Sequence, residues 1–312
     1  EKRLPQDGRI LAKVDGRDID LRIATIPSTQ GEKIVMRILD KASLVEGIHN
    51  LGFDALQAAT FQSMANNPHG MIFITGPTGS GKTTTLYTLL SSLDKRQKNI
   101  MTVEDPVEFE IEGITQTQTN VRAGLTFASG LRAFMRADPD IIMVGEVRDE
   151  ETADVAVNAA LTGHLVLSTL HTNDAAGAIH RIVEMGIKPY IVASSLTGVV
   201  AQRLVRKICP RCKKEIAVPD EYKSVLGSDI TKLYKGSGCD YCSNTGYKGR
   251  TGVFEVLNIS KELRKLIIEN ATADELNDYA IKQGMVTMQE SITAKVINGI
   301  TTMDEMMRVM KS

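Results

Sequence analysis

Apolar and polar residues alternate over much of the first forty positions, which is the pattern of β-strands with one buried face. Two alternating runs within residues 9–23 flank Asp15-Gly16, and an Asp-Gly pair between such runs favours a tight hairpin. Residues 32–39 predict a third strand. Three short strands cannot close a core alone, so we expect this piece to pack against a neighbouring domain or upstream sequence.

Beyond these strands, helical patterns alternate with short apolar runs. Apolar residues recur at helical spacing over residues 41–67 and lead into an apolar strand at 71–75. Strands joined through helices predict an α/β fold with a parallel sheet covered on both faces. The further strands are predicted at 100–103, 141–144 and 165–170, and the helices at 126–137, 150–161 and 175–185.

The last part of the chain carries one more predicted strand, at 253–257, followed by helical sequence from residue 260 onward. Methionine and isoleucine recur there at helical spacing, which is typical of core packing rather than of a cofactor stripe. The chain therefore divides into a small β-rich domain at 1–40, a linker and first helix region at 41–67, and a larger α/β domain at 68–312.

Composition narrows the class of protein. The 312 residues suffice for about two domains, and 42% hydrophobic with 24% charged residues excludes a disordered chain or a disulfide miniprotein. The 37 Lys and Arg balance 38 Asp and Glu, so no overall charge attracts nucleic acid or anionic lipid.

No apolar run approaches the roughly 18–20 residues of a membrane span, and no signal segment is apparent, which predicts a cytosolic protein. Because the chain opens at Glu1 without a methionine, we expect a fragment of a longer protein.

A phosphate-binding loop lies between the predicted strand at 71–75 and helical sequence. Residues 76–83 read Gly-Pro-Thr-Gly-Ser-Gly-Lys-Thr, a full match to the phosphate-loop pattern. Its glycines let main-chain N–H groups face an anion, and the helix that follows points its positive end at the same place. A glycine-rich turn without chemistry is the alternative. The residues predicted to bind nucleotide are Gly76, Pro77, Thr78, Gly79, Ser80, Gly81, Lys82, Thr83 and Thr84.

Two residues of the loop, Lys82 and Thr83, are expected to have specific roles in binding ATP and Mg²⁺. Carboxylates that follow other strands are expected to complete the site. Lys82 is expected to reach the β- and γ-phosphates of ATP, and the Thr83 hydroxyl to bind Mg²⁺. The strand at 141–144 leads to Glu146, where an acid that organises Mg²⁺ belongs. Glu104 is the first of three carboxylates in residues 104–108, one of which could serve as general base. A solvated acidic loop is the alternative reading of that segment.

His171 follows the strand at 165–170 and lies where a residue that senses the γ-phosphate could sit. A histidine beside a strand end is otherwise usually a structural residue.

All four cysteines fall into two Cys-x-x-Cys pairs separated by 26 residues. This spacing is typical of structural zinc, and four thiolates leave no open position for catalysis. Two disulfides, disfavoured in a reducing compartment, and metal-free thiols are the alternatives. Six basic residues between Arg203 and Lys214 raise the possibility of nucleic-acid binding, but aromatic residues do not interleave with them, so DNA or RNA is not expected. The predicted zinc ligands are Cys209, Cys212, Cys239 and Cys242.

Together and in this order, the motifs resemble those of the secretion ATPase superfamily. In that family's terms, residues 76–83 look like its Walker A motif, 104–108 its Asp box, 145–149 an atypical Walker B motif and 162–174 its His box. The resemblance covers essentially the whole chain. The four-cysteine element indicates the type II secretion and type IV pilus assembly ATPases, because the pilus retraction ATPases generally lack it.

The resemblance implies an ATPase of RecA-like fold over residues 68–312, with a zinc element at 203–257, behind part of a PAS-like domain at 1–40. It implies a homo-hexamer in the cytoplasm, at the inner face of the cytoplasmic membrane. Such a ring would use ATP and Mg²⁺ to drive pilus or pseudopilus assembly through an inner-membrane platform protein, with membrane association only through partners. Whether the chain serves secretion or pili is left open.

The resemblance also assigns roles to individual residues. Glu146 would help to hold Mg²⁺ and Glu104 would act as general base, although the two roles can be exchanged. Arg22 and Arg37 match arginines that reach a nucleotide phosphate from the small domain. Two other functions stay open: a scaffold that binds ATP without useful turnover, and a DNA motor of the related conjugation type.

Overall fold

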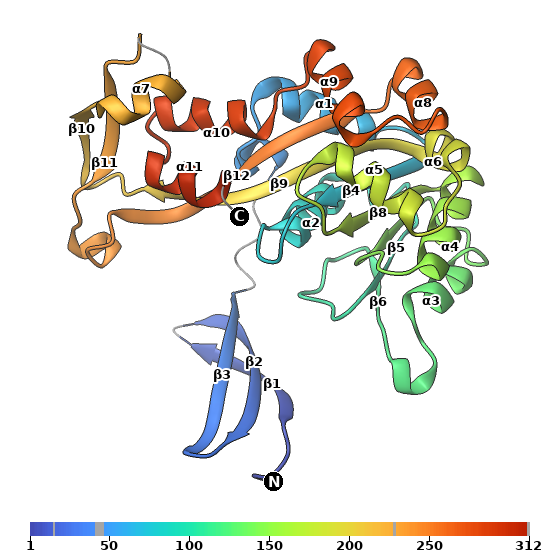
Figure 1. Ribbon diagram of the computed structural model, residues 1–312. Coiled ribbons are helices and arrows are strands. Elements are labelled where there is room, and N and C mark those ends of the chain that lie inside the picture. Colours follow the sequence, from blue (N-terminus) through green and yellow to red (C-terminus); the bar gives the residue numbers. More distant parts are fainter. Residues whose placement is uncertain (15, 41–46, 227–228, 311–312) are drawn as a thin grey trace.

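The computed structural model describes residues 1–14, 16–40, 47–226 and 229–310. The structure has three parts: an N-terminal sheet of three strands, a core built on a seven-stranded sheet, and an extension that carries the cysteines (Figure 1). Within the described residues, the helices are all too short or too polar to cross a membrane.

The N-terminal sheet is antiparallel, in the order β1-β2-β3. Val14 pairs with Arg17, so only two residues connect the first two strands and the predicted hairpin is confirmed. Asp15 of the predicted Asp-Gly turn and residues 41–46 of the predicted helical segment lie outside the described residues. The strands are β1 (Gln6–Val14), β2 (Arg17–Ser28) and β3 (Gly31–Asp40).

The core sheet has the strand order β12-β9-β4-β8-β7-β5-β6. Neighbouring strands are parallel except for β12, which pairs antiparallel with β9. The predicted parallel sheet is therefore confirmed, with an antiparallel strand added at one edge. The strands are β4 (Gly70–Thr75), β5 (Ile100–Glu104), β6 (Thr115–Gln118), β7 (Ile141–Val144), β8 (Leu165–Leu170), β9 (Leu196–Ile208) and β12 (Tyr247–Asn258).

Helices cover both faces of this sheet, as predicted. Side chains of consecutive strand residues point to opposite faces, so Phe73 packs into one apolar cluster while Ile72 and Ile74 pack into the other. One cluster contains α3 (Phe127–Phe134), α4 (Glu150–Leu161), α5 (Ala175–Glu184), α6 (Pro189–Ser195), α8 (Lys261–Ile268) and α9 (Ala273–Lys282). The other contains the 3-10 helix Ile48–Leu51, α1 (Ala55–Ala65) and α2 (Lys82–Ser92).

The extension grows from the long strands β9 and β12, which run past the core sheet (Figure 1). A third apolar cluster joins them to the C-terminal helices, and Met303 and Met306 lie in it, as the methionine pattern predicts. β12 is longer than predicted because its first half, rich in glycine and charge, forms a strand by pairing with β9. The added elements are β10 (Lys213–Ala217), α7 (Asp220–Leu226), β11 (Lys232–Gly236), the 3-10 helix Asp240–Cys242, α10 (Met288–Ile297) and α11 (Met303–Met310).

Candidate functional site

The phosphate loop connects the end of β4 to the start of α2 and is braced by β9. A Cβ atom on Gly76 would lie 2.4 Å from the Gln202 main-chain oxygen, so the close approach of the two segments requires glycine there. The Gln202 side chain donates to the Ser80 main-chain oxygen and accepts from the Thr85 hydroxyl, each at 2.8 Å. Gly81 precedes α2 without a side-chain cap. The first N–H groups of the helix are therefore free to bind an anion.

Lys82 is buried in this loop, and its ammonium donates to the main-chain oxygens of Gly76 at 2.7 Å and Pro77 at 3.2 Å. Burial lowers the pKa of Lys82 to about 8; the nearby Glu146 works against this shift and Arg203 adds to it. A buried ammonium whose contacts within the described chain are carbonyl oxygens gains from an anionic partner. Lys82 thus fits the phosphate-binding role predicted for it.

Glu146 follows β7 and lies close to two other polar groups of the site. Its carboxylate is 2.5 Å from the Arg148 guanidinium and 3.5 Å from His171 Nε2, which follows β8. Burial and the charge of Lys82 lower the pKa of His171 in spite of the Glu146 carboxylate. The fold therefore brings Lys82, Glu146 and His171 together at the carboxyl ends of β4, β7 and β8, as the motifs predict.

Glu104 ends β5, the strand beside β7, but its carboxylate is enclosed, with the residue only 3% exposed. One oxygen accepts from the Thr102 hydroxyl at 2.7 Å and the Gln116 amide at 3.1 Å, and the other accepts from the Tyr87 hydroxyl. A carboxylate with three donors is held in one orientation. The role of Glu104 as general base stays a prediction.

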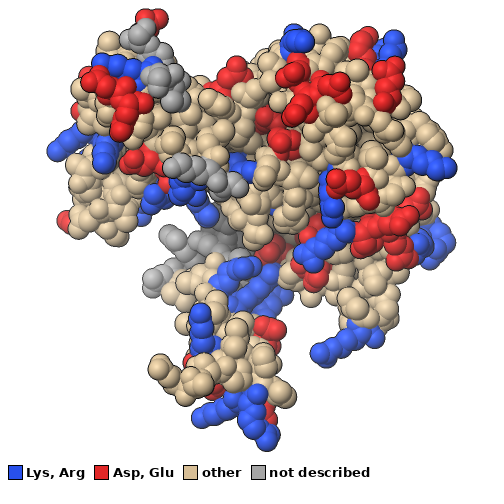
Figure 2. Space-filling model, in the orientation of Figure 1, with Lys and Arg blue, Asp and Glu red and all other residues tan. Residues whose placement is uncertain are grey.

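Three arginines form a row across the N-terminal sheet, since Arg9 pairs with Arg22 and Arg22 with Arg37. Arg22 donates to the Val107 main-chain oxygen at 3.0 Å and lies 3.1 Å from the Glu108 carboxylate. Figure 2 shows basic side chains gathered at the upper end of this sheet, beside acidic side chains of the core. Like charges directly opposite each other are unfavourable, and the Glu108 carboxylate offsets part of this charge at Arg22. That Arg22 and Arg37 reach nucleotide stays a prediction.

The four cysteines converge at the far end of the extension, and their sulfur atoms all lie within 4.8 Å of one another. Three of the sulfur pairs are 3.7, 3.8 and 3.9 Å apart. Zinc–sulfur bonds of about 2.3 Å place the sulfurs of a tetrahedral site roughly 3.8 Å apart, whereas a disulfide needs about 2.05 Å. Main-chain N–H groups of Cys239 and Gly246 also point at Cys242 Sγ, each at 3.3 Å. The cluster fits one tetrahedral metal ion.

Comparison with known proteins identifies the family. The sequence profile described as "Type II/IV secretion system protein" matches residues 1–308. The chain belongs to this family. It is 47% identical over 312 residues to the type II secretion system protein E of Pseudomonas aeruginosa, an alignment that covers 99% of this chain and 62% of that protein. It is 50% identical over 312 residues to the type IV pilus assembly ATPase PilB of Thermus thermophilus, with 98% of this chain and 35% of PilB covered. The chain thus spans 62% or less of the length of these two relatives.

Solved structures agree with this membership of the type II/IV secretion system family. A crystal structure of the pilus retraction motor PilT with bound ADP superposes with a TM-score of 0.70 at 28% identity, over 98% of this chain and 78% of that one. The Legionella pneumophila ATPase DotB superposes with a TM-score of 0.72 at 21% identity. The fold is therefore the α/β fold of these ATPases.

Two residues that the sequence reasoning missed are central to this family member's site. Gln202 braces the phosphate loop, and Tyr87 contacts Glu104 from α2. The one available signal for Gln202 was the polar pair Gln202-Arg203 inside an apolar run. Tyr87 gave none, because a tyrosine within an apolar helix face also suits a core position.

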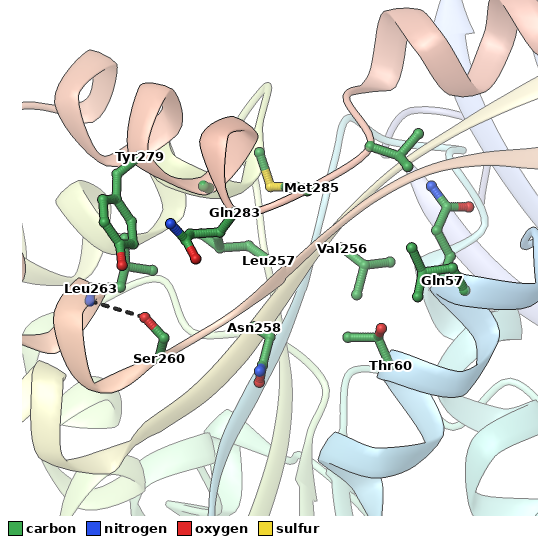
Figure 3. Close-up of a pocket in the computed structure, with 14 residues that line it drawn as sticks. Gln57, Thr60, Val256, Leu257, Asn258, Ser260, Leu263, Tyr279, Gln283 and Met285 are labelled. Carbon is green, nitrogen blue, oxygen red and sulfur yellow. Dashed lines mark hydrogen bonds between the residues drawn. The ribbon is translucent and has the colours of Figure 1, made fainter.

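A cavity of about 250 Å³ lies elsewhere, between α1, β12, α8 and α9 (Figure 3). Gln57 and Thr60 line it from α1, and Asn258, Ser260 and Tyr279 line it from the opposite side. Its described lining residues include none with a charge. It therefore offers no charge to neutralise a phosphate, and the phosphate loop fits a nucleotide better than this cavity does.

Proposed function

We propose that this chain is the ATP-hydrolysing motor of a pilus or pseudopilus assembly machine, in type IV pilus biogenesis or type II secretion. The observation that carries the proposal is the convergence of Lys82, Glu146 and His171 beside a formed phosphate loop. The names of relatives point the same way, since one is called a type II secretion protein and another a pilus assembly ATPase.

Nucleotide binding would use main-chain N–H groups and the lysine of the phosphate loop. The N–H groups at the start of α2 would hold the phosphates, and Lys82 would exchange its carbonyl partners for phosphate oxygens. Thr83 and Glu146 would hold Mg²⁺, with oxygen ligands that suit this ion. Bound Mg²⁺ would neutralise charge on the β- and γ-phosphate oxygens.

Hydrolysis requires an activated water in line with the γ-phosphate. We assign the general base to Glu104: the water gives its proton to this carboxylate, its oxygen bonds to the γ-phosphorus, and the bond from phosphorus to ADP breaks. Arg22 and Arg37 would stabilise the charge on the transferred group from the small sheet. Arg22 would first have to leave Glu108. Turnover would then depend on how the small sheet sits against the core.

The assembly and partners follow from the same proposal. The chain would act as a homo-hexamer in the cytoplasm, at the inner face of the membrane, and bind an inner-membrane platform protein. The three-stranded sheet would be part of a PAS-like domain, and residues 68–312 a RecA-like motor. The four cysteines would hold a structural zinc ion that keeps the extension folded.

The test is ATP hydrolysis by purified protein with Mg²⁺, as isolated and as an enforced hexamer. Lys82→Ala should lower turnover at least 100-fold, since it removes the charge that meets the phosphates. Lys265→Ala, on the exposed face of α8, is the matched control and should retain full activity. The proposal fails if the enforced hexamer hydrolyses no ATP and Lys82→Ala behaves identically. Tight ATP binding without turnover would indicate a scaffold instead.

A further inference from the structure

Tyr87 lies on α2, five residues after Lys82, and is completely buried. Its ring packs edge-on against Phe109, with ring centres 4.5 Å apart and planes at 80°. Its hydroxyl donates to the Glu104 carboxylate and accepts from the Glu108 main-chain N–H at 3.2 Å. The tyrosine therefore connects the phosphate-loop helix to two residues of the acidic segment.

The two oxygens of Glu104 are held differently. Oε1 accepts from both Thr102 and Gln116, whereas Tyr87 is the donor to Oε2 among the contacts of the described chain. Burial and the negative charge of Glu104 raise the pKa of Tyr87, so the phenol stays protonated and remains a donor. The direction of Oε2 thus depends on the Tyr87 hydroxyl, because among the described residues this hydroxyl is the one donor to that oxygen.

The same hydroxyl is linked to the N-terminal sheet. Glu108, whose N–H points at the Tyr87 oxygen, pairs through its carboxylate with Arg22 at 3.1 Å. Arg22 also binds the neighbouring Val107 main-chain oxygen. A movement of Arg22 away from this segment would shift the Glu108 main chain, and with it the acceptor and donor contacts of Tyr87.

We propose that Tyr87 is a positioning residue for hydrolysis. Its hydroxyl orients Glu104 Oε2, and this orientation changes when the Arg22–Glu108 contact forms or breaks. This inference rests on the proposed function, in which Glu104 takes the proton of the attacking water. In this role Tyr87 acts through Glu104 and not on the nucleotide itself. Its loss should therefore slow the chemical step while leaving nucleotide binding intact.

The experiment compares Tyr87→Phe with Ser92→Ala in the full chain. Both changes remove one hydroxyl from α2, but the Ser92 hydroxyl donates to the Leu89 oxygen of its own helix. Tyr87→Phe should lower kcat about tenfold or more, with KM for ATP and affinity for ADP changed less than about twofold. In a Glu104→Asp background the shorter side chain already breaks the hydrogen bond to Tyr87. There Tyr87→Phe should lower kcat by less than about twofold.

A measurement independent of activity accompanies the kinetics. Tyr87→Phe deprives the Glu108 N–H of its acceptor, so hydrogen exchange in a peptide over residues 104–114 should become faster, while Ser92→Ala leaves it unchanged. If Tyr87→Phe proves unstable, Gln116→Leu removes a donor to Oε1 from the edge strand and should also slow kcat at constant KM.

The outcomes separate this inference from the proposed function. Hydrolysis by the wild type with an unchanged kcat in Tyr87→Phe would overturn the positioning role and leave the ATPase proposal standing. An equal fall in kcat from Tyr87→Phe in the wild-type and Glu104→Asp backgrounds would also overturn the positioning role, since Tyr87 would then act on another group than Glu104. If the wild-type hexamer hydrolyses no ATP, both the ATPase proposal and the positioning role of Tyr87 are wrong.

Discussion

The Lys82 ammonium lies 2.7 Å from the main-chain oxygen of Gly76, so the lysine of the phosphate loop is folded back onto its own loop. Its hydrogen bonds to the Gly76 and Pro77 oxygens hold the lysine in the loop, although its positive charge is buried. The carbonyl partners carry only partial charge. A phosphate that enters the loop therefore meets an ammonium that gains from full charge neutralisation.

The first prediction concerns the pH dependence of nucleotide binding. The pKa of Lys82 is lowered to about 8, and a bound phosphate should raise it again. Above pH 8 the free protein loses this proton while the complex keeps it, so ADP affinity should fall by up to about tenfold per pH unit. Calorimetric titration in two buffers of different ionisation enthalpy should register proton uptake on binding. Lys82→Arg, charged throughout this range, should lack the dependence. Constant wild-type affinity from pH 7 to 9.5 would contradict the prediction.

The second prediction concerns the arginine row. Arg22→Gln and Arg37→Gln should each lower kcat about 100-fold or more, because each removes charge that would face the transferred phosphoryl group. Arg3→Gln, at a side chain that is 87% exposed, is the control and should have little effect. Steady-state kinetics at saturating ATP measure the difference. Full activity in both Arg22→Gln and Arg37→Gln would contradict the prediction. It would show that groups of the core, without these arginines, neutralise the phosphates.

The third prediction concerns the cysteine cluster. Freshly reduced protein should contain one zinc ion per chain by elemental analysis. Strong chelators, or Cys212→Ser, should lower the melting temperature and speed hydrogen exchange over residues 209–246, because folding of this tip depends on the metal. ADP binding should persist, since the phosphate loop lies in a separate part of the core. Metal-free protein with unchanged melting and exchange would contradict a structural zinc site.

The fourth prediction concerns the buried Glu305 of α11, which bonds to Arg206 on β9 and to Arg308 on its own helix. Burial acts to raise the pKa of Glu305, but hydrogen bonds from Arg308 and Arg206 outweigh it and lower the pKa to about 2. Its contribution to stability is therefore present above pH 4.5 and lost as pH falls toward 2. Glu305→Gln should cost about 2 kcal/mol of unfolding free energy at pH 7.

Urea unfolding at pH 7 and pH 3 measures this contribution. Asp304→Asn, one residue earlier and exposed, is the matched control and should change stability by about 0.5 kcal/mol or less, the size of a helix-dipole effect. The difference in unfolding free energy between Glu305→Gln and the wild type should be smaller at pH 3 than at pH 7. A constant difference at both pH values would contradict the ionic origin of the effect.

The sequence predicts those parts of the fold that local patterns determine. β4, β7 and β8 are buried on both faces, so their residues are almost all apolar and stand out from their surroundings. The phosphate loop and the cysteine pairs have fixed spacing along the chain. Their residues, with Glu146 and His171, could therefore be named before the fold was known.

What the sequence does not predict depends on contacts between distant segments. β9 contains Gly198, Gln202 and Arg203, which interrupt its apolar pattern, yet it pairs on both sides within the sheet. Gln202 bonds to Ser80 across 122 positions, and Tyr87 bonds to Glu104 across 17. Side chains brought together by the sheet order leave no periodic signal, so only the folded arrangement identifies their roles.

β9 is one unbroken strand of 13 residues that touches the phosphate loop near its middle and ends beside Cys209. At about 3.3 Å per residue, Gln202 and the cysteine cluster are roughly 20 Å apart along the same strand. A tilt of β9 of about ten degrees at the loop would thus swing the cysteine tip by roughly 3–4 Å. If β9 tilts as one rigid strand, a small change at the phosphate loop is therefore accompanied by a larger displacement at the cysteines.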